Sequence, residues 1–270
     1  MVKVIPIDTF KSFDLHLPNG DPTGILSIPH AGTEIPEDMA PFLINDEWAL
    51  NQDVDWRVDE LVDIDYLKSL GIAVIKANIH RVAIDINRPE ERTVFCWKKN
   101  THGLDLLNEE PDELQRKLFI EKYHKTYFDA LADLISQSVH KSRKVVPVID
   151  LHSMPSRPTE YHLQMNPQQK MERPGICLSD LEGKSCIPEY IELLEKEFTE
   201  RGLDPAINDP YLGGYVTQFV DKFNANVVQI EINRDVYMDE KVREIRPEAF
   251  ESLKANLMET LERQYKLFCP

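Results

Sequence analysis

Residues 145–153 read Val-Val-Pro-Val-Ile-Asp-Leu-His-Ser, and this stretch decides the fold class. Its first seven residues, Val145–Leu151, are almost wholly apolar, which predicts a strand that is buried on both faces. Such strands are typical of parallel sheets that carry helices on either side. The polar residues Asp150, His152 and Ser153 come at the end of this strand, where ligands bind in open α/β sheets.

Working outward, similar apolar runs alternate with patterns of helical spacing. We predict further strands at Gly24–Pro29, at Ile72–Ala77 with Val82–Ile86 extending or following it, and at Val227–Ile232. Apolar residues at helical spacing predict helices at Trp56–Leu70, Pro111–Val139, Ile187–Arg201 and Pro247–Phe268, with Gly71 and Gly202 as C-terminal stops. The alternation predicts one α/β domain over residues 1–270, with a mixed, mostly parallel sheet and helices on both faces.

The segment Met154–Ser185 is long for a plain connection and holds several prolines. We predict an irregular loop there, either lying over the functional site or forming a surface excursion.

The composition restricts the class of protein. The formal net charge is −16 and the chain shows no basic stripe, which argues against a nucleic-acid partner. The four cysteines form no close pair, so we expect reduced thiols. The N-terminus has no signal pattern, and no apolar run reaches the roughly 20 residues of a membrane span. We therefore expect a cytoplasmic protein without a membrane partner and leave its oligomeric state open. An anionic substrate would require a locally positive pocket.

Each predicted strand is followed by polar residues, and the fold brings strand ends together. The four groups are His30 and Glu34; Arg81, Asp85, Asn87 and Arg88; Asp150, His152 and Ser153; and Glu231, Asn233 and Arg234.

Two imidazoles and one carboxylate are the ligand set of a catalytic zinc whose fourth position holds water. His30 and His152 are the expected imidazoles. Asp55 is the preferred acid, although it could instead cap the following helix. Glu34, Asp53 and Asp59 remain open alternatives. Zinc would supply a nucleophile near neutral pH and polarise a carbonyl, but cobalt or manganese would suit similar ligands.

Asn87 and Arg88 are suited to holding a substrate carboxylate. The alternative is a structural salt bridge of Asp85 with Arg88 or Arg81. Glu231 ends a strand that we expect to be buried, and burial would raise its pKa and suit it to general-base chemistry. It could otherwise be a structural partner of an arginine, either Arg234 or Arg88.

Taken together, these segments resemble the N-formylglutamate amidohydrolase family and, more distantly, the zinc carboxypeptidase superfold. The matching segments are Ser27–Thr33, Asp55–Leu61, Arg81–Pro89, Ile149–Met154, Gly213–Thr217, Gln229–Asn233 and Tyr237–Glu240, and they run in the family's order.

The resemblance implies His30 and His152 as zinc ligands, Asn87 and Arg88 at the substrate carboxylate, and Glu231 as the base. Arg81 would steady the oxyanion, and Tyr215 and Tyr237 stand at further positions where we expect substrate contact. The sequence departs from the pattern at three places. Thr33 stands where the carboxypeptidases place their acidic ligand, the segment Ile232-Asn233-Arg234 after the base differs, and Arg57 stands where the family often has His.

The resemblance therefore implies a metal-dependent amidohydrolase with one zinc per chain. Its substrate would be N-formyl-L-glutamate or a related small anionic N-acyl amino acid, as in histidine degradation. Zinc-bound water would attack, with Glu231 as general base. A zinc carboxypeptidase-like peptidase or peptide amidase on the same scaffold is the first alternative. A non-catalytic protein that binds acylated amino acids is the second.

Overall fold

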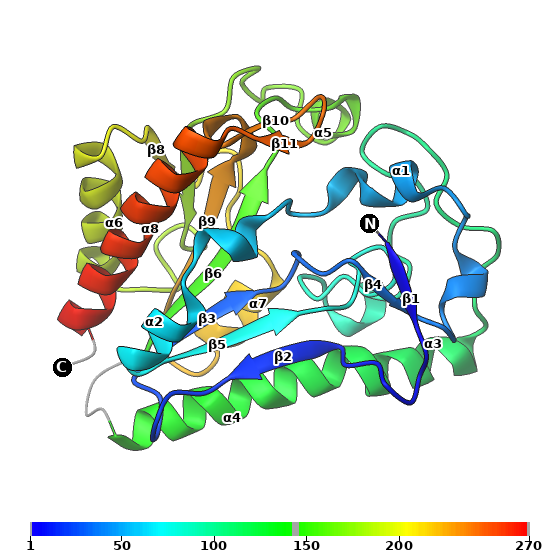
Figure 1. The fold of residues 1–270 in the computed structure, drawn as a ribbon, viewed down its shortest axis with the longest axis horizontal. Helices are drawn as coiled ribbons and strands as arrows, with labels where there is room; N and C mark the ends of the chain where they lie inside the picture. The colour runs from blue at the N-terminus through cyan, green and yellow to red at the C-terminus, as the bar shows by residue number, and fades with distance from the viewer. Residues whose placement is uncertain (1, 142–145, 269–270) are drawn as a thin grey trace.

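A seven-stranded mixed sheet forms the centre of the computed structural model, which describes residues 2–141 and 146–268 (Figure 1). Its strand order is β2-β5-β3-β6-β9-β7-β8. The strands are β2 (Phe13–His16), β5 (Ile72–Ala77), β3 (Gly24–Ile28), β6 (Pro147–Met154), β9 (Asn226–Asn233), β7 (Ile176–Ser179) and β8 (Pro205–Ile207).

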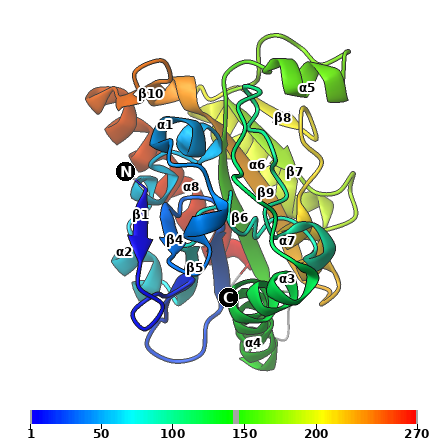
Figure 2. The same ribbon diagram turned by 90° about the vertical axis from the view of Figure 1, so that its right-hand side faces the viewer.

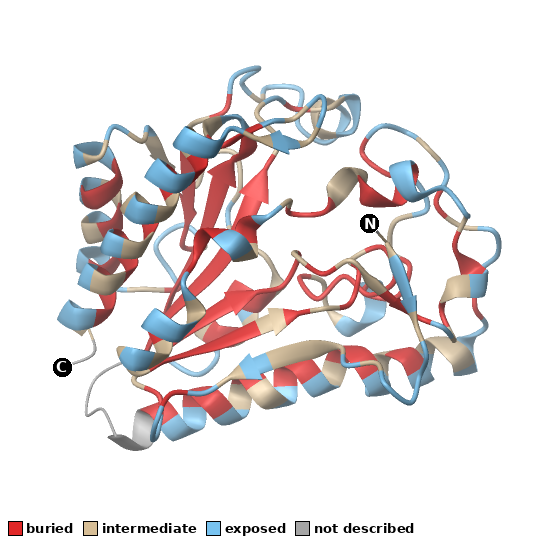
Figure 3. Cartoon of the chain, viewed as in Figure 1, coloured by how far each residue is buried: buried red, intermediate tan, exposed pale blue. Residues whose placement is uncertain are grey.

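The middle of the sheet is parallel, and antiparallel pairs lie toward its edges. Strands β5, β3, β6 and β9 pair in parallel, whereas β2 runs antiparallel to β5 and β7 antiparallel to β9. Figure 3 shows the central strands as almost continuously buried. The prediction of a mixed, mostly parallel sheet is confirmed.

Helices cover both faces of the sheet (Figures 1 and 2). One hydrophobic core joins the first face to α4 (Lys125–Lys141) and α7 (Tyr215–Asp221). The core on the other face includes α2 (Ile64–Ser69), α6 (Pro188–Glu200) and α8 (Pro247–Phe268). Burying both sheet faces explains why the central strands are apolar along most of their length.

Shorter elements surround this frame. They are the strands β1 (Lys3–Ile5), β4 (Glu34–Pro36), β10 (Met238–Asp239) and β11 (Glu244–Ile245), and the helices α1 (Glu47–Leu50), α3 (Glu113–Phe119) and α5 (Glu160–Met165). Five 3-10 turns lie at 40–42, 51–53, 58–61, 90–92 and 234–236 among the described residues.

Several predicted elements are confirmed within a residue or two. The helix predicted over 111–139 begins after Asp112, whose side chain forms a capping box with Gln115, and it passes through a π-helical turn at Ile120–His124 before α4. The predicted strand start at Val145 lies outside the described residues. Strands β6 and β9 extend to Met154 and Asn233, so His152 and Glu231 lie within strands rather than after them.

Three predictions need correction. The helix expected over 56–70 is interrupted, because Arg57 adopts a left-handed φ of 57° and Val62 is extended; only a 3-10 turn (Val58–Leu61) and α2 form. Residues 82–86 form turns with one bridge from Ile84 to Val94 instead of a strand. The segment 154–185 is not wholly irregular, since it contains α5 and β7.

Two further observations concern the cysteines and the membrane. Cys96, Cys177 and Cys186 are free thiols, as expected, whereas Cys269 lies outside the described residues. Among the described residues, every helix is too short or too polar to cross a bilayer.

Candidate metal centre and its pocket

His30, Asp55 and His152 come together at the carboxyl end of the central strands. His30 lies just after β3, His152 lies in the neighbouring strand β6, and the Asp55 backbone N–H donates to the His30 carbonyl at 3.1 Å. One ligand atom from each of the three residues lies within 4.8 Å of the other two. The Asp55 carboxylate is 3.0 Å from His152 Nδ1 and 3.8 Å from His30 Nδ1. All three side chains are buried.

The Nε2 atom of each imidazole, on the side of the ring opposite Asp55, lies within hydrogen-bonding distance of a carboxylate. His30 Nε2 is 2.7 Å from Asp85, and His152 Nε2 is 3.1 Å from Asp150. Asp150 also accepts a hydrogen bond from Ser27 Oγ at 2.8 Å. These bonds fix both rings with Nδ1 directed toward Asp55, the arrangement in which histidine ligands of metals are usually held.

The donor set therefore fits a metal ion such as zinc. It offers two imidazole nitrogens and a carboxylate oxygen on converging side chains, which is a three-residue catalytic set that leaves one coordination position open. The alternatives to Asp55 lie elsewhere: Asp53 accepts hydrogen bonds from Thr101, Asp59 pairs with Lys76, and Glu34 lies in strand β4. Asp55 does not cap the elements that follow it: the 3-10 turn at Val58–Leu61 begins after Arg57 without a side-chain cap, and Asp63 caps α2.

Burial and neighbouring charges shift the two histidines in opposite directions. Burial, helped by the Arg81 charge, lowers the pKa of His30 to about 4, so this ring is neutral and ready to act as a ligand. Burial also acts to lower the pKa of His152, but the carboxylates of Asp150 and Asp55 outweigh it and raise that pKa well above its ordinary value. A metal binding here must therefore displace a proton from His152.

Arg81 and Arg88 surround the buried carboxylate of Asp85. Arg81 donates to Asp85 at 3.1 Å and to the Asp53 carbonyl at 2.9 Å, and it lies 3.8 Å from Asp55. Arg88 is 4.0 Å from Asp85 and about one-third exposed. The structural salt bridge weighed from the sequence therefore exists, at Arg81. It holds the pKa of Asp85 well below its usual range, although burial alone would raise it.

Glu231 lies beside His152 on the next strand, since the two residues are register partners in the β6–β9 pair. Its carboxylate accepts a hydrogen bond from Gln229 Nε2 at 2.9 Å, and within the described chain it makes no ion pair with Arg234 or Arg88. Burial raises the pKa of Glu231 to about 7, against the opposing influence of His152. A carboxyl group in this state can exchange a proton near neutral pH.

The Asn87 side chain forms hydrogen bonds through both its nitrogen and its oxygen. Its Nδ2 lies 3.3 Å from His152 Nε2, and its Oδ1 accepts from the Val216 backbone N–H at 2.9 Å. Gly214 packs so closely that a Cβ there would meet the Asn87 amide at 2.1 Å, so glycine is required. The Tyr215 ring packs against Phe128 at a centroid distance of 5.1 Å. Asn87 thus links the centre to the start of α7.

Tyr237 is fully buried in the core on the far face of the sheet. Its hydroxyl donates to the Trp56 carbonyl at 2.6 Å. This bond ties the residue after Asp55 to the body of the protein, so Tyr237 positions the segment that carries Asp55.

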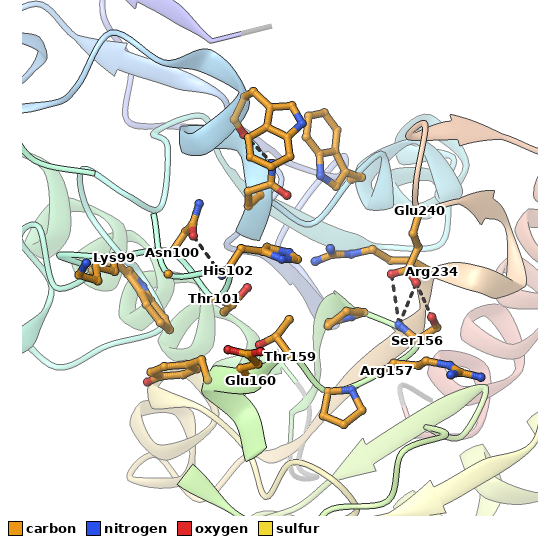
Figure 4. Close-up of a pocket in the computed structure, with 18 of the residues that line it drawn as sticks. Lys99, Asn100, Thr101, His102, Ser156, Arg157, Thr159, Glu160, Arg234 and Glu240 are labelled. Atoms are coloured by element: carbon orange, nitrogen blue, oxygen red, sulfur yellow. Dashed lines mark hydrogen bonds between the residues drawn. The ribbon is translucent and has the colours of Figure 1, made fainter. Parts of the chain in front are cut away.

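Figure 4 shows a pocket of about 1340 Å³, which adjoins the centre through two of its lining residues. Trp56 and Arg234 connect the two, because Trp56 follows Asp55 in the chain and Arg234 is 3.7 Å from the Asp55 carboxylate. Its lining holds six basic residues and two acidic ones: Lys98, Lys99, Arg157, Arg234, Lys241 and Arg243 against Glu160 and Glu240. Four of these six cations lie beside carboxylates, which leaves Lys241 and Arg243 as the basic side chains available to an anionic ligand.

Sequence reasoning named Asp85 and Arg234 as polar residues near strand ends or as ion-pair partners, and Asp150 only as a polar residue near a strand end. The structure places the two aspartates behind the histidines and Arg234 between the centre and the pocket, where it also donates to Ser153 Oγ at 3.1 Å. The two-residue spacing of Asp150 and His152 was an available signal, because alternate residues of a strand share a face.

Comparisons with known proteins show what this chain is similar to. The chain is 25% identical over 229 residues to N-formylglutamate deformylase from Pseudomonas putida, covering 80% of this chain and 82% of that protein. Among solved structures, an N-formylglutamate amidohydrolase from Ralstonia eutropha superposes with a TM-score of 0.81 at 24% identity, covering 95% of this chain and 98% of that chain. A gene product from Agrobacterium tumefaciens reaches 0.65 at 17% identity, covering 94% and 97%.

Metallo-carboxypeptidases are among the more distant structural matches. The family model described as N-formylglutamate amidohydrolase matches residues 23–238, a span that contains every predicted site residue. The chain therefore belongs to the N-formylglutamate amidohydrolase family, whose members are hydrolases that act on an amide bond.

Proposed function

We propose that this protein is a metal-dependent amidohydrolase that hydrolyses N-formyl-L-glutamate or a closely related N-acyl acidic amino acid. The cluster of His30, Asp55 and His152, with a carboxylate behind each imidazole, is the observation that carries the proposal. The family match and the basic side chains that line the pocket support it. Zinc is the metal that we propose, with cobalt or manganese as alternatives for the same donors.

A metal ion held by these three residues supplies Lewis-acid polarisation of the substrate carbonyl and makes water acidic enough to attack near neutral pH. Glu231 lies beside His152 and takes the proton from the attacking water. Its raised pKa of about 7 lets the same carboxyl group release this proton to the leaving amine.

Positive side chains around the centre stabilise negative charge as it develops. Arg81 is held by Asp85 and by the Asp53 carbonyl, so its guanidinium needs little reorganisation to face an oxyanion. Arg88 is the more exposed cation of this loop and is proposed to bind a substrate carboxylate. The geometry supports positioning roles for Asn87, Tyr215 and Tyr237, whose predicted direct contact with substrate stays a prediction.

A substrate panel tests the proposal. Purified protein, stripped of metal and reloaded with zinc, is assayed for amine release from N-formyl-L-glutamate, N-acetyl-L-glutamate and a glutamate-containing dipeptide. We expect turnover of the formyl substrate only after zinc loading. Turnover of the dipeptide alone would favour the peptidase alternative. Tight binding without turnover would favour a binding protein. A role in histidine degradation and a cytoplasmic location stay predictions.

A further inference from the structure

The pocket beside the metal centre holds a cation whose surroundings the proposed reaction does not use. Arg243 lies in the turn between β10 and β11, and its side chain enters the pocket lining. Its guanidinium carbon lies 5.1 Å from the ring centroid of Trp56 and 5.8 Å from that of Trp48. Contact with two indole rings fixes the direction of a planar guanidinium.

Most other basic residues of the pocket are already paired with carboxylates. Lys98 pairs with Glu110, Lys99 with Asp105 at 3.1 Å, and Arg157 with Glu172 at 3.7 Å. Arg234 is directed toward Asp55. Within the described residues 2–141 and 146–268, no carboxylate forms an ion pair with Arg243 or with Lys241 in the same turn. Arg243 is therefore available for an anion from solution.

Among the described residues, neither acidic residue of the pocket forms an ion pair with Arg243. The carboxylate of Glu240 accepts hydrogen bonds from the backbone N–H and the hydroxyl of Ser156, as the dashed lines in Figure 4 show. Glu160 lies on α5 and is exposed. The guanidinium of Arg243, flanked by two indole rings, thus faces the pocket and is not paired with a carboxylate among the described residues.

The backbone at Arg243 gives a second, independent indication. Its φ is 57°, a left-handed conformation that Gly or Asn adopts more readily at the end of a hairpin turn. A bulky residue in such a conformation often marks a site where function has opposed local stability.

Arg243 lines the pocket together with two residues that adjoin the metal centre. Its guanidinium packs on Trp56, the residue that follows Asp55, and the pocket residue Arg234 is 3.7 Å from the Asp55 carboxylate. In an extended N-acylglutamate, five bonds separate the acyl carbon from the side-chain carboxyl carbon, which is about 6 Å. A hydrogen bond adds about 3 Å. A substrate whose acyl carbon lies at the centre therefore extends its side-chain carboxylate, hydrogen bond included, about 9 Å toward the pocket that Arg243 lines.

We propose that Arg243 binds the side-chain carboxylate of the substrate and so selects N-acyl amino acids that carry an acidic side chain. This inference rests on the proposed amidohydrolase function and names the residue that sets its side-chain specificity. Arg88 and Arg243 then bind the two different carboxylates of one substrate.

The test compares N-formyl-L-glutamate with N-formyl-L-glutamine, which differ only in the charge of the side-chain terminus. In Arg243→Asn the charge is removed while the left-handed backbone is favoured, so folding is preserved. We expect kcat/KM for the glutamate substrate to fall about 10- to 100-fold through a higher KM, with the glutamine substrate changed less than about threefold. Arg243→Lys should restore part of the preference.

Arg157→Gln is the matched control, because Arg157 lines the same pocket but is mostly exposed and paired with Glu172. It should leave the preference unchanged. An equal loss on both substrates in Arg243→Asn, or an unchanged preference, would overturn the assignment of Arg243. If the zinc-loaded wild-type protein hydrolyses neither substrate, the proposed function itself fails, and this result is distinct from a wild-type enzyme whose preference ignores Arg243.

Discussion

The carboxylate of Asp150 should control how tightly the centre holds its metal. Asp150 is fully buried, lies 3.1 Å from His152 Nε2 and is itself held by Ser27. Replacing it with Asn keeps the shape of the side chain but removes the charge that makes His152 a strong ligand.

The expected size of the effect follows from the geometry. His152 Nδ1, the nitrogen that faces Asp55, lies about 5 Å from the Asp150 carboxylate once the width of the imidazole is added to the hydrogen bond. At an effective dielectric constant of about 20, two unit charges at that separation interact by about 3 kcal/mol, which bounds the loss. We therefore expect Asp150→Asn to weaken zinc binding by about 10- to 100-fold, in line with the usual effect of such partners.

Competition with a chromogenic chelator measures the zinc dissociation constant. Asp65→Asn is the matched control, because the Asp65 carboxylate on α2 is 92% exposed and pairs with Lys68 rather than with a residue of the centre. Circular dichroism confirms that both variants are folded. Wild-type zinc affinity in a folded Asp150→Asn variant would refute the role given to Asp150 and weaken the case for His152 as a ligand.

Three further predictions follow from the same geometry. Glu231→Gln should retain zinc but reduce kcat by at least about 100-fold, because the base is lost while the ligands remain; near-normal turnover in a steady-state assay would remove Glu231 from the mechanism. The kcat/KM of the wild-type enzyme should fall about tenfold per unit as pH decreases below the Glu231 pKa of about 7, because the protonated carboxyl cannot accept a proton. A bound metal cation lowers the pKa of Glu231 and so moves this fall in kcat/KM to lower pH. A fall that is centred clearly above pH 7 would contradict the assignment. Tyr237→Phe leaves the Trp56 carbonyl without its buried donor. It should lower stability by about 1–3 kcal/mol and the Tm by several degrees in a thermal melt, and an unchanged Tm would show that this bond does not hold the Asp55 segment.

The fold was predictable where burial alone decides the pattern. Strands β3, β5, β6 and β9 are apolar along most of their length because helices cover both sheet faces, and that requirement is visible in the sequence. The short strands β7 and β8 at one side of the sheet escaped prediction, because runs of four and three residues carry too little pattern.

The same reasoning explains what could be predicted of the site. His30 and His152 come from adjacent strands, whose carboxyl ends must meet in a parallel sheet. Asp55 was harder to choose, because it reaches His152 across 97 residues from an irregular segment whose path depends on the left-handed Arg57. The closer pairing of Asp85 with Arg81 than with Arg88, and the indole contacts of Arg243, are side-chain geometry that sequence spacing does not specify.

The central claim is that His30, Asp55 and His152 hold a metal ion that amide hydrolysis requires. The most direct measurement is the metal content of protein purified without added metal, by inductively coupled plasma mass spectrometry, for the wild type, His30→Ala and His152→Ala. The account predicts about one zinc per wild-type chain and loss of both zinc and N-formylglutamate hydrolysis in each variant. Wild-type protein that hydrolyses the substrate without stoichiometric metal, or variants that keep their metal, would contradict it.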